Sequence, residues 1–201
     1  EDMTAEQLKE ALRYISKETH LRTKSYRMLS DGVQGEFLQA FSMMVSPKNI
    51  LEIGTFTGYA TLCLSRGLQV GGVIDTIEID DELTEVFTTA FKIAQQDAII
   101  THSGDAKEII PTLDRIYDIV YIDANKREYA AYYDLIFPKV SSGGYILVDN
   151  VIWSGKIFSQ KKHLDWQTEA IISFNDKVKS DCRVEVLTLP VRDGLSLIRK
   201  L

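Results

Sequence analysis

The stretch Asn49–Tyr59, NILEIGTFTGY, decides the fold of this chain. An apolar strand ends at Ile53, a loop with Gly54 and Gly58 follows, and an apolar helix pattern begins directly after it. In this order a strand, a glycine loop and a helix open a nucleotide-binding α/β unit, because glycines let the backbone approach a ligand and the helix start offers free N–H groups. The stretch therefore predicts a Rossmann-like α/β fold.

A second apolar strand ends in TIEID, Thr76–Asp80. It places Glu78 about two dozen residues after Gly54, the interval expected of an acid that binds a ribose. The glycine spacing is Gly-x-x-x-Gly, whereas a pyrophosphate is seated by Gly-x-Gly-x-x-Gly. With Glu52 just before Gly54, the loop suits an adenosine ligand that carries no diphosphate. This pattern favours S-adenosylmethionine over NAD.

Strand-like and helix-like segments alternate through most of the chain, which indicates a parallel sheet with helices on both faces. Strands are predicted at 50–53, 72–79, 99–103, 118–123 and 145–149, and helices at 4–16, 31–45, 58–68, 81–95, 106–113, 127–137 and 165–178. Thr4 and Gln7 have the spacing of a capping box. The runs 183–189 and 195–201 have no helix between them and must form an antiparallel hairpin. The predicted fold is thus a seven-stranded, mostly parallel sheet with an antiparallel C-terminal hairpin.

Length and composition favour one domain over residues 1–201, with an N-terminal helical cap at 1–46 and a Rossmann-like core at 47–201. We expect the apolar stripes of the cap to face the ligand crevice or a second subunit. No apolar run approaches a membrane span, no signal-peptide pattern is present, and Cys63 and Cys182 are interpreted as reduced, so a cytoplasmic location without membrane contact is expected. The net charge of −6 argues against a nucleic-acid partner.

Two further strands end in carboxylates. Ile119–Lys126 reads IVYIDANK and Ile146–Asn150 reads ILVDN, so Asp123 and Asp149 close their strands and Asn150 follows the second. Taken alone, each acid is more often a helix cap or a turn residue. Because the ligand crevice of an open α/β sheet lies beyond the carboxyl ends of its strands, however, we expect both acids to face the same crevice as Gly54 and Glu78. Such an oxygen set suits Mg²⁺, with Mn²⁺ or Ca²⁺ as alternatives.

From about Tyr26 to Leu201 the chain resembles the cation-dependent class I O-methyltransferases, which include caffeoyl-coenzyme-A and catechol O-methyltransferases. The likeness rests on LEIGTFTGY, YIDANKREY, VDNVIWSGK and LPVRDGLSLIRK. It implies that Asp123, Asp149 and Asn150 hold the metal and that Trp153 lies in the segment walling the acceptor pocket. It also implies a cofactor site lined by Ser30, Glu52, Gly54, Thr55, Gly58, Tyr59, Ala60, Glu78, Asp105, Ala106, Asp123 and Asn125. The chain departs from the family pattern at Asn125, where many relatives have an aspartate, and at Ala60, where relatives often have a serine.

The resemblance assigns Lys126, together with Asp123, to catalysis, because a matching lysine assists removal of the substrate proton. A phenolic hydroxyl with a pKa near 10 is a poor nucleophile at neutral pH, so a cation and a positioned lysine would promote its methylation. The alternative to a catalytic role for Lys126 is that of a solvated residue at a helix start. The aromatic run Tyr129, Tyr132, Tyr133 and Phe137 is interpreted as packing or a dimer face rather than a substrate cage.

The leading hypothesis is a metal-dependent O-methyltransferase for a small phenolic acceptor, working as a homodimer of the kind common in the family. One alternative is a relative that methylates a hydroxylated uridine of tRNA, for which Arg13, Arg22, Lys24 and Arg27 offer a local basic patch. Another is a non-catalytic adenosine-binding module. The basic cluster at 161–163 is interpreted as a solvated loop.

Overall fold

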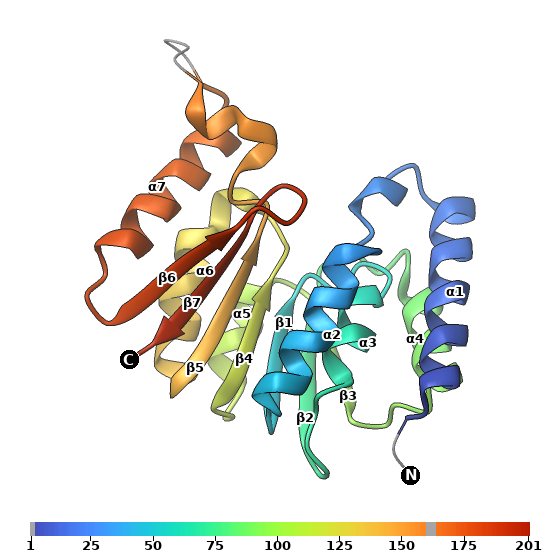
Figure 1. Ribbon diagram of the computed structural model, residues 1–201. Helices are drawn as coiled ribbons and strands as arrows, with labels where there is room; N and C mark the ends of the chain where they lie inside the picture. The colour runs from blue at the N-terminus through green and yellow to red at the C-terminus, as the bar shows by residue number, and fades with distance from the viewer. Residues whose placement is uncertain (1–2, 160–163) are drawn as a thin grey trace. The chain divides into compact units, whose positions relative to one another are not determined.

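The computed structural model describes residues 3–159 and 164–201, which form two compact units, Glu1–Asp105 and Ala106–Leu201. Figure 1 traces the chain through both. The basic cluster at 161–163 lies outside the described residues. Each unit contributes strands and the helices that pack on them, and each is described by itself.

The first unit contains a parallel three-stranded sheet with the strand order β3-β2-β1. Its strands are β1 (Asn49–Ile53), β2 (Val73–Glu78) and β3 (Ile99–Ser103). Its helices are α1 (Ala5–Arg22), the short η1 (Tyr26–Met28), α2 (Val33–Val45), α3 (Tyr59–Ser65) and α4 (Thr84–Ile93). β1 and β2 are almost fully buried, as the apolar runs predicted.

Helix α1 belongs to the core of the first unit. Thr4 and Gln7 form the predicted capping box, and Leu8, Ala11 and Ile15 are buried in one apolar cluster with Phe87 of α4 and other residues of the unit. Figure 1 shows α1 lying alongside α4. The expectation that this stripe faces the crevice or a second subunit is therefore wrong. The helix also continues past its predicted end at residue 16, to Arg22.

The second unit contains strands in the order β4-β5-β7-β6. β4 is parallel to β5, and β7 is antiparallel to both β5 and β6. These strands are β4 (Tyr117–Ile122), β5 (Val140–Asp149), β6 (Val184–Leu189) and β7 (Leu195–Lys200). Its helices are α5 (Ala106–Ile109), α6 (Tyr129–Ile136) and α7 (Trp166–Ser180), with short 3-10 turns η2 (Ile110–Thr112), η3 (Lys126–Glu128), η4 (Phe137–Lys139) and η5 (Trp153–Phe158). β5 begins earlier than predicted, at Val140, and its register with β4 shifts between Val140 and Tyr145.

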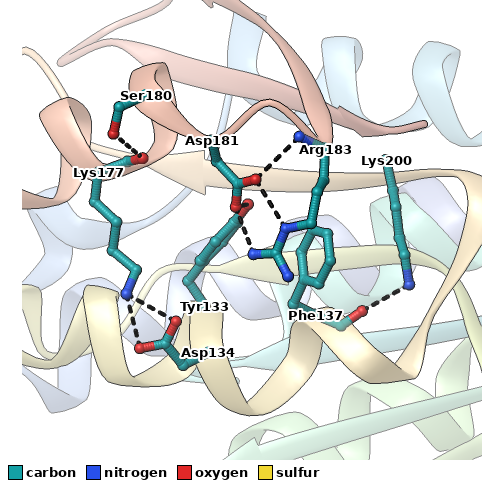
Figure 2. Close-up of polar contacts among 8 residues, drawn as sticks. All are labelled: Tyr133, Asp134, Phe137, Lys177, Ser180, Asp181, Arg183 and Lys200. Carbon is teal, nitrogen blue, oxygen red and sulfur yellow. Dashed lines mark hydrogen bonds and ion pairs between the residues drawn. The ribbon is translucent and has the colours of Figure 1, made fainter.

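A polar cluster anchors the open end of the β6–β7 hairpin to α6. Figure 2 shows Arg183 stacked over the ring of Phe137, with the guanidinium carbon 3.9 Å from the ring centroid. Asp181 accepts hydrogen bonds from Arg183 Nε at 2.8 Å and from the Tyr133 hydroxyl at 2.9 Å. The predicted aromatic run is thereby explained as packing, since Tyr129, Tyr132, Tyr133 and Phe137 are all buried.

Candidate functional site

The loop after β1 needs both of its glycines. Gly54 has φ 100° and donates its N–H to the carbonyl of Ile77 at 2.9 Å, which joins the loop to β2. Gly58 has φ 83° and directly precedes α3. A Cβ atom there would lie 2.7 Å from the Phe91 ring, so a side chain cannot be accommodated without movement. The predicted glycine loop is thus present, with the start of α3 at its end.

Glu78 lies against this loop, as its predicted role requires. Its carboxylate accepts the Phe56 N–H at 2.7 Å and the Asp80 N–H at 3.0 Å. Phe56 has φ 50°, a left-handed conformation that costs a non-glycine residue free energy. The carboxylate is only half-buried, and an ionised carboxylate has about four lone-pair sites, so it retains capacity for ligand hydroxyl groups.

Glu52 occupies the root of the same loop and is fully buried. It accepts hydrogen bonds from the hydroxyls of Thr61 and Thr76, the latter at 2.5 Å. The Thr76 hydroxyl also lies 2.6 Å from that of Thr55. Because Thr76 donates to Glu52, Thr55 must be the donor to Thr76. Glu52 therefore organises the loop from beneath, and its predicted contact with the cofactor stays a prediction.

Helix α1 also contacts this loop. The buried Thr19 hydroxyl donates to the carbonyl of Ile15 at 2.6 Å and lies 3.1 Å from the Thr57 hydroxyl. Sequence periodicity missed this role because Thr19 lies beyond the last apolar position of the predicted helix. The extra turns of α1 thus support the conformation of the loop.

Close approach of α2 brings two more predicted cofactor residues together. A Cβ atom on Gly35 would lie 2.7 Å from the Tyr59 ring and 3.0 Å from the Ser30 carbonyl. Burial is the main cause that raises the pKa of Tyr59 to about 12, so its hydroxyl stays protonated at neutral pH. Ser30 and Ala60 are buried.

Asp105 ends the first unit, and the buried Ala106 begins both the second unit and α5. Asn125 caps η3 by accepting the Arg127 N–H at 3.3 Å, which is the turn role open to such a residue. Most of the predicted cofactor residues lie in the first unit and the metal set in the second. Their meeting in one crevice stays a prediction.

The strand register brings the two predicted metal-binding acids to neighbouring positions. Ile122 of β4 pairs with Val148 of β5, so Asp123 and Asp149 are the next residues at the carboxyl ends of two adjacent strands. Adjacent strands lie roughly 4.8 Å apart. Asp149 is 3% exposed, and its carboxylate accepts the N–H of Asn150 at 2.7 Å. Asn150 has φ 61°, a left-handed conformation that asparagine tolerates.

Lys126 forms an ion pair with Asp123, in which Nζ lies 2.8 Å from Oδ1. Both side chains are mostly buried, with exposed fractions of 13% and 19%. Nζ also lies 5.6 Å from the centroid of the Tyr129 ring. The two predicted catalytic residues are therefore in direct contact, which rules against a solvated Lys126.

Tyr129 underlies the metal set and was not predicted to do so. Its hydroxyl donates to the backbone carbonyl of Asp149 at 2.9 Å. Burial, with the charges of Asp123 and Asp149, raises the pKa of this tyrosine well above its ordinary value. Its position in an aromatic run indicated packing alone, and nothing in the sequence distinguishes this hydroxyl from the others.

The predicted metal ligands form a hard, all-oxygen donor set on two adjacent strands, which fits Mg²⁺. Across residues 3–159 and 164–201, no group of three or more His, Cys, Asp and Glu side chains gathers as a metal site. The predicted set has only two acids, and its third member is an amide, so metal binding by this set stays a prediction.

Trp153 lies on the loop that follows β5, and its indole Nε1 is buried. Within the described part of the chain this atom has no hydrogen-bond partner. The ammonium of Lys156 lies 5.4 Å from the centroid of the indole ring. The loop therefore presents a desolvated N–H donor near the metal ligands in sequence.

A cavity of about 590 Å³ lies in the first unit between α1 and α2. Its charged lining residues are Lys9, Arg13, Glu36 and Arg66. The cations outnumber the single acid, so the formal charge of this lining is positive.

A family profile described as O-methyltransferase matches residues 1–201. Caffeoyl-CoA O-methyltransferase 1 of Nicotiana tabacum is 28% identical over 190 residues, which cover 87% of this chain and 78% of the relative.

Solved structures are similar as well. SAH-bound methyltransferase PaMTH1 of Podospora anserina has a TM-score of 0.86 at 30% identity, over 95% of this chain and 88% of that one. The SAM complex of TomG, an O-methyltransferase of Streptomyces achromogenes involved in tomaymycin synthesis, has a TM-score of 0.84 at 26% identity, over 98% and 90%. These similarities confirm the predicted fold class, and both structures hold a form of the predicted S-adenosyl cofactor.

Proposed function

The chain belongs to the O-methyltransferase family and is an S-adenosylmethionine-dependent enzyme, and from that premise we propose that it needs a divalent cation and methylates a catechol-like or hydroxycinnamoyl-type hydroxyl. The observation that carries the proposal is the register of β4 with β5, which puts Asp123 and Asp149 on adjacent strand ends with Lys126 paired to the first. Asp123, Asp149 and Asn150 would hold the cation, with Mg²⁺ expected ahead of Mn²⁺ or Ca²⁺.

A bound divalent cation would supply positive charge that favours the ionised form of an acceptor hydroxyl. In the observed ion pair, Lys126 Nζ donates to Asp123 Oδ1 at 2.8 Å. An ammonium in this position stabilises negative charge on an acceptor oxygen, whereas a base would first have to lose the proton held against Asp123. We therefore assign Lys126 the stabilising role first and proton removal second.

The acceptor subsite is proposed at Trp153. A buried donor that stays unpaired costs about 1–3 kcal/mol, so an acceptor that offers an oxygen to Nε1 would gain affinity there. The indole also offers an apolar surface to an aromatic ring, and aromatic pairs add about 0.5–1.5 kcal/mol beyond the area they bury. Both properties suit a phenolic ring with oxygen substituents.

For the tRNA alternative, the structure bears on one member of the predicted basic patch. Arg22 donates to Glu18 and Glu85 at 2.9 and 2.7 Å, and these hydrogen bonds raise the pKa of Arg22, the bond to Glu85 most of all. Arg13 instead lines the cavity between α1 and α2. The acids beside Arg22 weaken the local attraction for phosphate, so the small-molecule acceptor stays the proposal.

A homodimer is also proposed for the working enzyme. Large apolar side chains are exposed on the first unit, and exposed apolar patches mark association sites in other proteins. They are Leu21, Tyr26, Met28, Val33, Met43 and Met44. Sedimentation at several protein concentrations would test this, and a monomer at every concentration would contradict it.

No described helix is long and apolar enough to cross a membrane, and the cytoplasmic location stays a prediction.

The function is tested by incubating the full chain with isotope-labelled S-adenosylmethionine and three acceptors: a vicinal diol, its mono-hydroxy analogue and hypomodified tRNA. Mass spectrometry then follows label transfer with Mg²⁺, with chelator, and after Mg²⁺ is restored. We expect transfer to the diol only when the cation is present, and at least about a hundredfold slower transfer to the mono-hydroxy analogue. Equal rates on both phenols, undiminished transfer in chelator, or label on tRNA alone would overturn the proposal.

A further inference from the structure

The turn joining β6 to β7 holds the loop that follows β5. The turn residues Asp193 and Gly194 accept hydrogen bonds through their carbonyls from three successive N–H groups of the loop. The bonds are Val151 to Gly194 at 3.1 Å, Ile152 to Asp193 at 2.8 Å and Trp153 to Asp193 at 3.2 Å. The loop is thus attached along its length to a segment about 40 residues away in sequence.

The Asp193 carboxylate extends this attachment by one residue. Its Oδ1 accepts both the N–H and the hydroxyl of Ser154 at 3.2 Å, and its Oδ2 lies 3.3 Å from the same hydroxyl. Trp153 and Ser154 have φ values of 51° and 52°, which are left-handed conformations unfavourable to both residue types. Such conformations persist only where the surroundings hold them, and here the surrounding group is Asp193.

Glycine at position 194 makes the close approach of turn and loop feasible. A Cβ atom there would lie 2.3 Å from Ile152 Cγ1, and the φ of 88° is itself unfavourable for other residues. The other end of the loop is fixed separately. The Tyr129 hydroxyl bonds the Asp149 carbonyl, and Asn175 Nδ2 donates to the Val151 carbonyl at 2.9 Å.

We propose that Asp193 is a positioning residue for the methyl transfer, which acts by holding Trp153 and Ser154 of the loop after β5 in their left-handed conformations. The inference rests on the proposed acceptor role of this loop. Asp193 acts through hydrogen-bond acceptance rather than through its charge, because both of its side-chain partners are neutral Ser154 groups. An asparagine at the position can keep the Oδ1 acceptor, whereas an alanine cannot.

Trp153 can report on its own position. The chain has two tryptophans, and the other, Trp166, is 77% exposed. In a Trp166→Phe background, the tryptophan fluorescence, excited selectively over that of the tyrosines, therefore comes from Trp153 alone. Asp193→Ala should shift its emission to longer wavelength and raise its quenching by acrylamide about twofold or more, as expected when a residue held by its surroundings is released. Asp193→Asn should restore both to near the parent values.

The same variants are assayed for methyl transfer with a vicinal diol. We expect Asp193→Ala to raise the acceptor KM about tenfold, the scale of one or two lost hydrogen bonds, with a smaller fall in kcat and unchanged S-adenosylmethionine affinity. Asp176→Ala is the matched control, since this exposed acid on α7 has no hydrogen bond or ion pair in the described part of the chain. It should leave every readout unchanged.

Ser154→Ala provides a second route if Asp193→Ala does not fold. It removes the hydroxyl and keeps the backbone bond, so it should move the emission and the KM in the same direction by about twofold. Unchanged Trp153 emission, quenching and KM in a folded Asp193→Ala protein would overturn the inference. So would failure of Asp193→Asn to restore them. If the parent transfers no methyl group to any diol, the proposed function fails, and the fluorescence results still decide whether Asp193 holds the loop.

Discussion

Two loops after parallel strands carry the predicted chemistry, and each is held by a carboxylate that accepts a backbone N–H. In the loop after β1, Glu78 accepts the N–H of Phe56 at 2.7 Å. In the loop after β5, Asp193 accepts the N–H of Ser154 at 3.2 Å. In both cases the N–H belongs to a left-handed residue that is not glycine. The two loops therefore use the same means to keep an unfavourable backbone conformation.

The difference lies in what else each carboxylate does. Glu78 is also the predicted ribose ligand, so the shape of its loop and the binding of the cofactor depend on one group. Asp193 supports Trp153 and Ser154 but is not itself predicted to contact a ligand. Changes at Glu78 should therefore alter cofactor affinity directly, whereas changes at Asp193 should act only through the residues it holds.

Replacing a predicted metal ligand should give the largest loss of activity. The loss should affect turnover, which depends on the second unit, and not the binding of the cofactor. Asp149→Asn keeps an acceptor for the Asn150 N–H and removes the charge. We expect turnover to fall by at least about a hundredfold because charge stabilisation of the acceptor oxygen is lost, while S-adenosylmethionine affinity stays within about twofold. Turnover assays and calorimetry measure the two quantities. Equal losses in both would show that the two loops are not functionally separate.

Replacing Glu78 should give the opposite separation. Glu78→Ala should weaken S-adenosylmethionine binding at least about tenfold, because it loses charge-assisted acceptance worth roughly 1.5–3 kcal/mol per bond. Glu78→Gln keeps one acceptor for the Phe56 N–H and should lie between the alanine variant and the parent. Mg²⁺ affinity, measured by calorimetry, should be the same in all three proteins. Unchanged cofactor affinity in the alanine variant would remove Glu78 from the site.

The first loop could be predicted because its parts are close in sequence or follow one strand pattern. The glycines, the strand before them and the acid at the end of the next strand form a single recognisable unit in Asn49–Tyr59 and Thr76–Asp80. The adjacent positions of Asp123 and Asp149 were predictable for the same reason, as each lies at the end of an apolar strand, whereas their binding of a metal stays a prediction. Residue type and spacing suffice when the partners lie on adjacent parallel strands.

The supports of the second loop could not be predicted, because they come from three separate elements. Tyr129, Asn175 and Asp193 reach the loop over sequence distances of 20 to 39 residues. Nothing in the pattern of α7 marks Asn175, which lies among ordinary polar helix residues. Asp193 in LPVRDGL resembles a turn residue, and its second role depends on how closely Gly194 lets the turn approach Ile152.

The extent of α1 was missed for a related reason. Its apolar periodicity fades after Ile15, yet the helix continues to Arg22. The additional turns contain Thr19, which bonds the first loop through Thr57. Likewise β5 starts at Val140, which pairs with Tyr117 of β4, although Ser141 and Gly144 are poor strand formers and the regular register with β4 resumes only at Tyr145.

A smaller effect is expected at the root of the first loop. Thr76→Val keeps the shape of the side chain but removes the hydroxyl that joins Glu52 to Thr55. We expect the free energy of unfolding to fall by about 1–3 kcal/mol, because a buried carboxylate loses one of its donors. Thr88→Val, a partly exposed hydroxyl on α4, is the control and should change stability by less than about 0.5 kcal/mol. Urea unfolding measures both, and equal effects would contradict the supporting role of Glu52.

The smallest effect is expected at the open end of the β6–β7 hairpin, far along the strands from Asp193. Hydrogen bonds from Arg183 are the main cause that holds the pKa of Asp181 well below its usual range. Since the folded-state pKa is depressed, the stability from this carboxylate is present above the ordinary aspartate pKa near 3.9 and is lost as the pH falls through that range and below. Asp181→Asn should therefore lower the melting temperature at pH 7 by less than about 3 °C, as an ion pair with an exposed arginine implies. The difference in melting temperature between parent and variant should narrow as the pH falls below about 4.

Trp153 emission should not change in Asp181→Asn, because the turn that holds its loop lies at the other end of the hairpin. A shift in that emission would show that the whole hairpin, rather than Asp193, sets the position of Trp153.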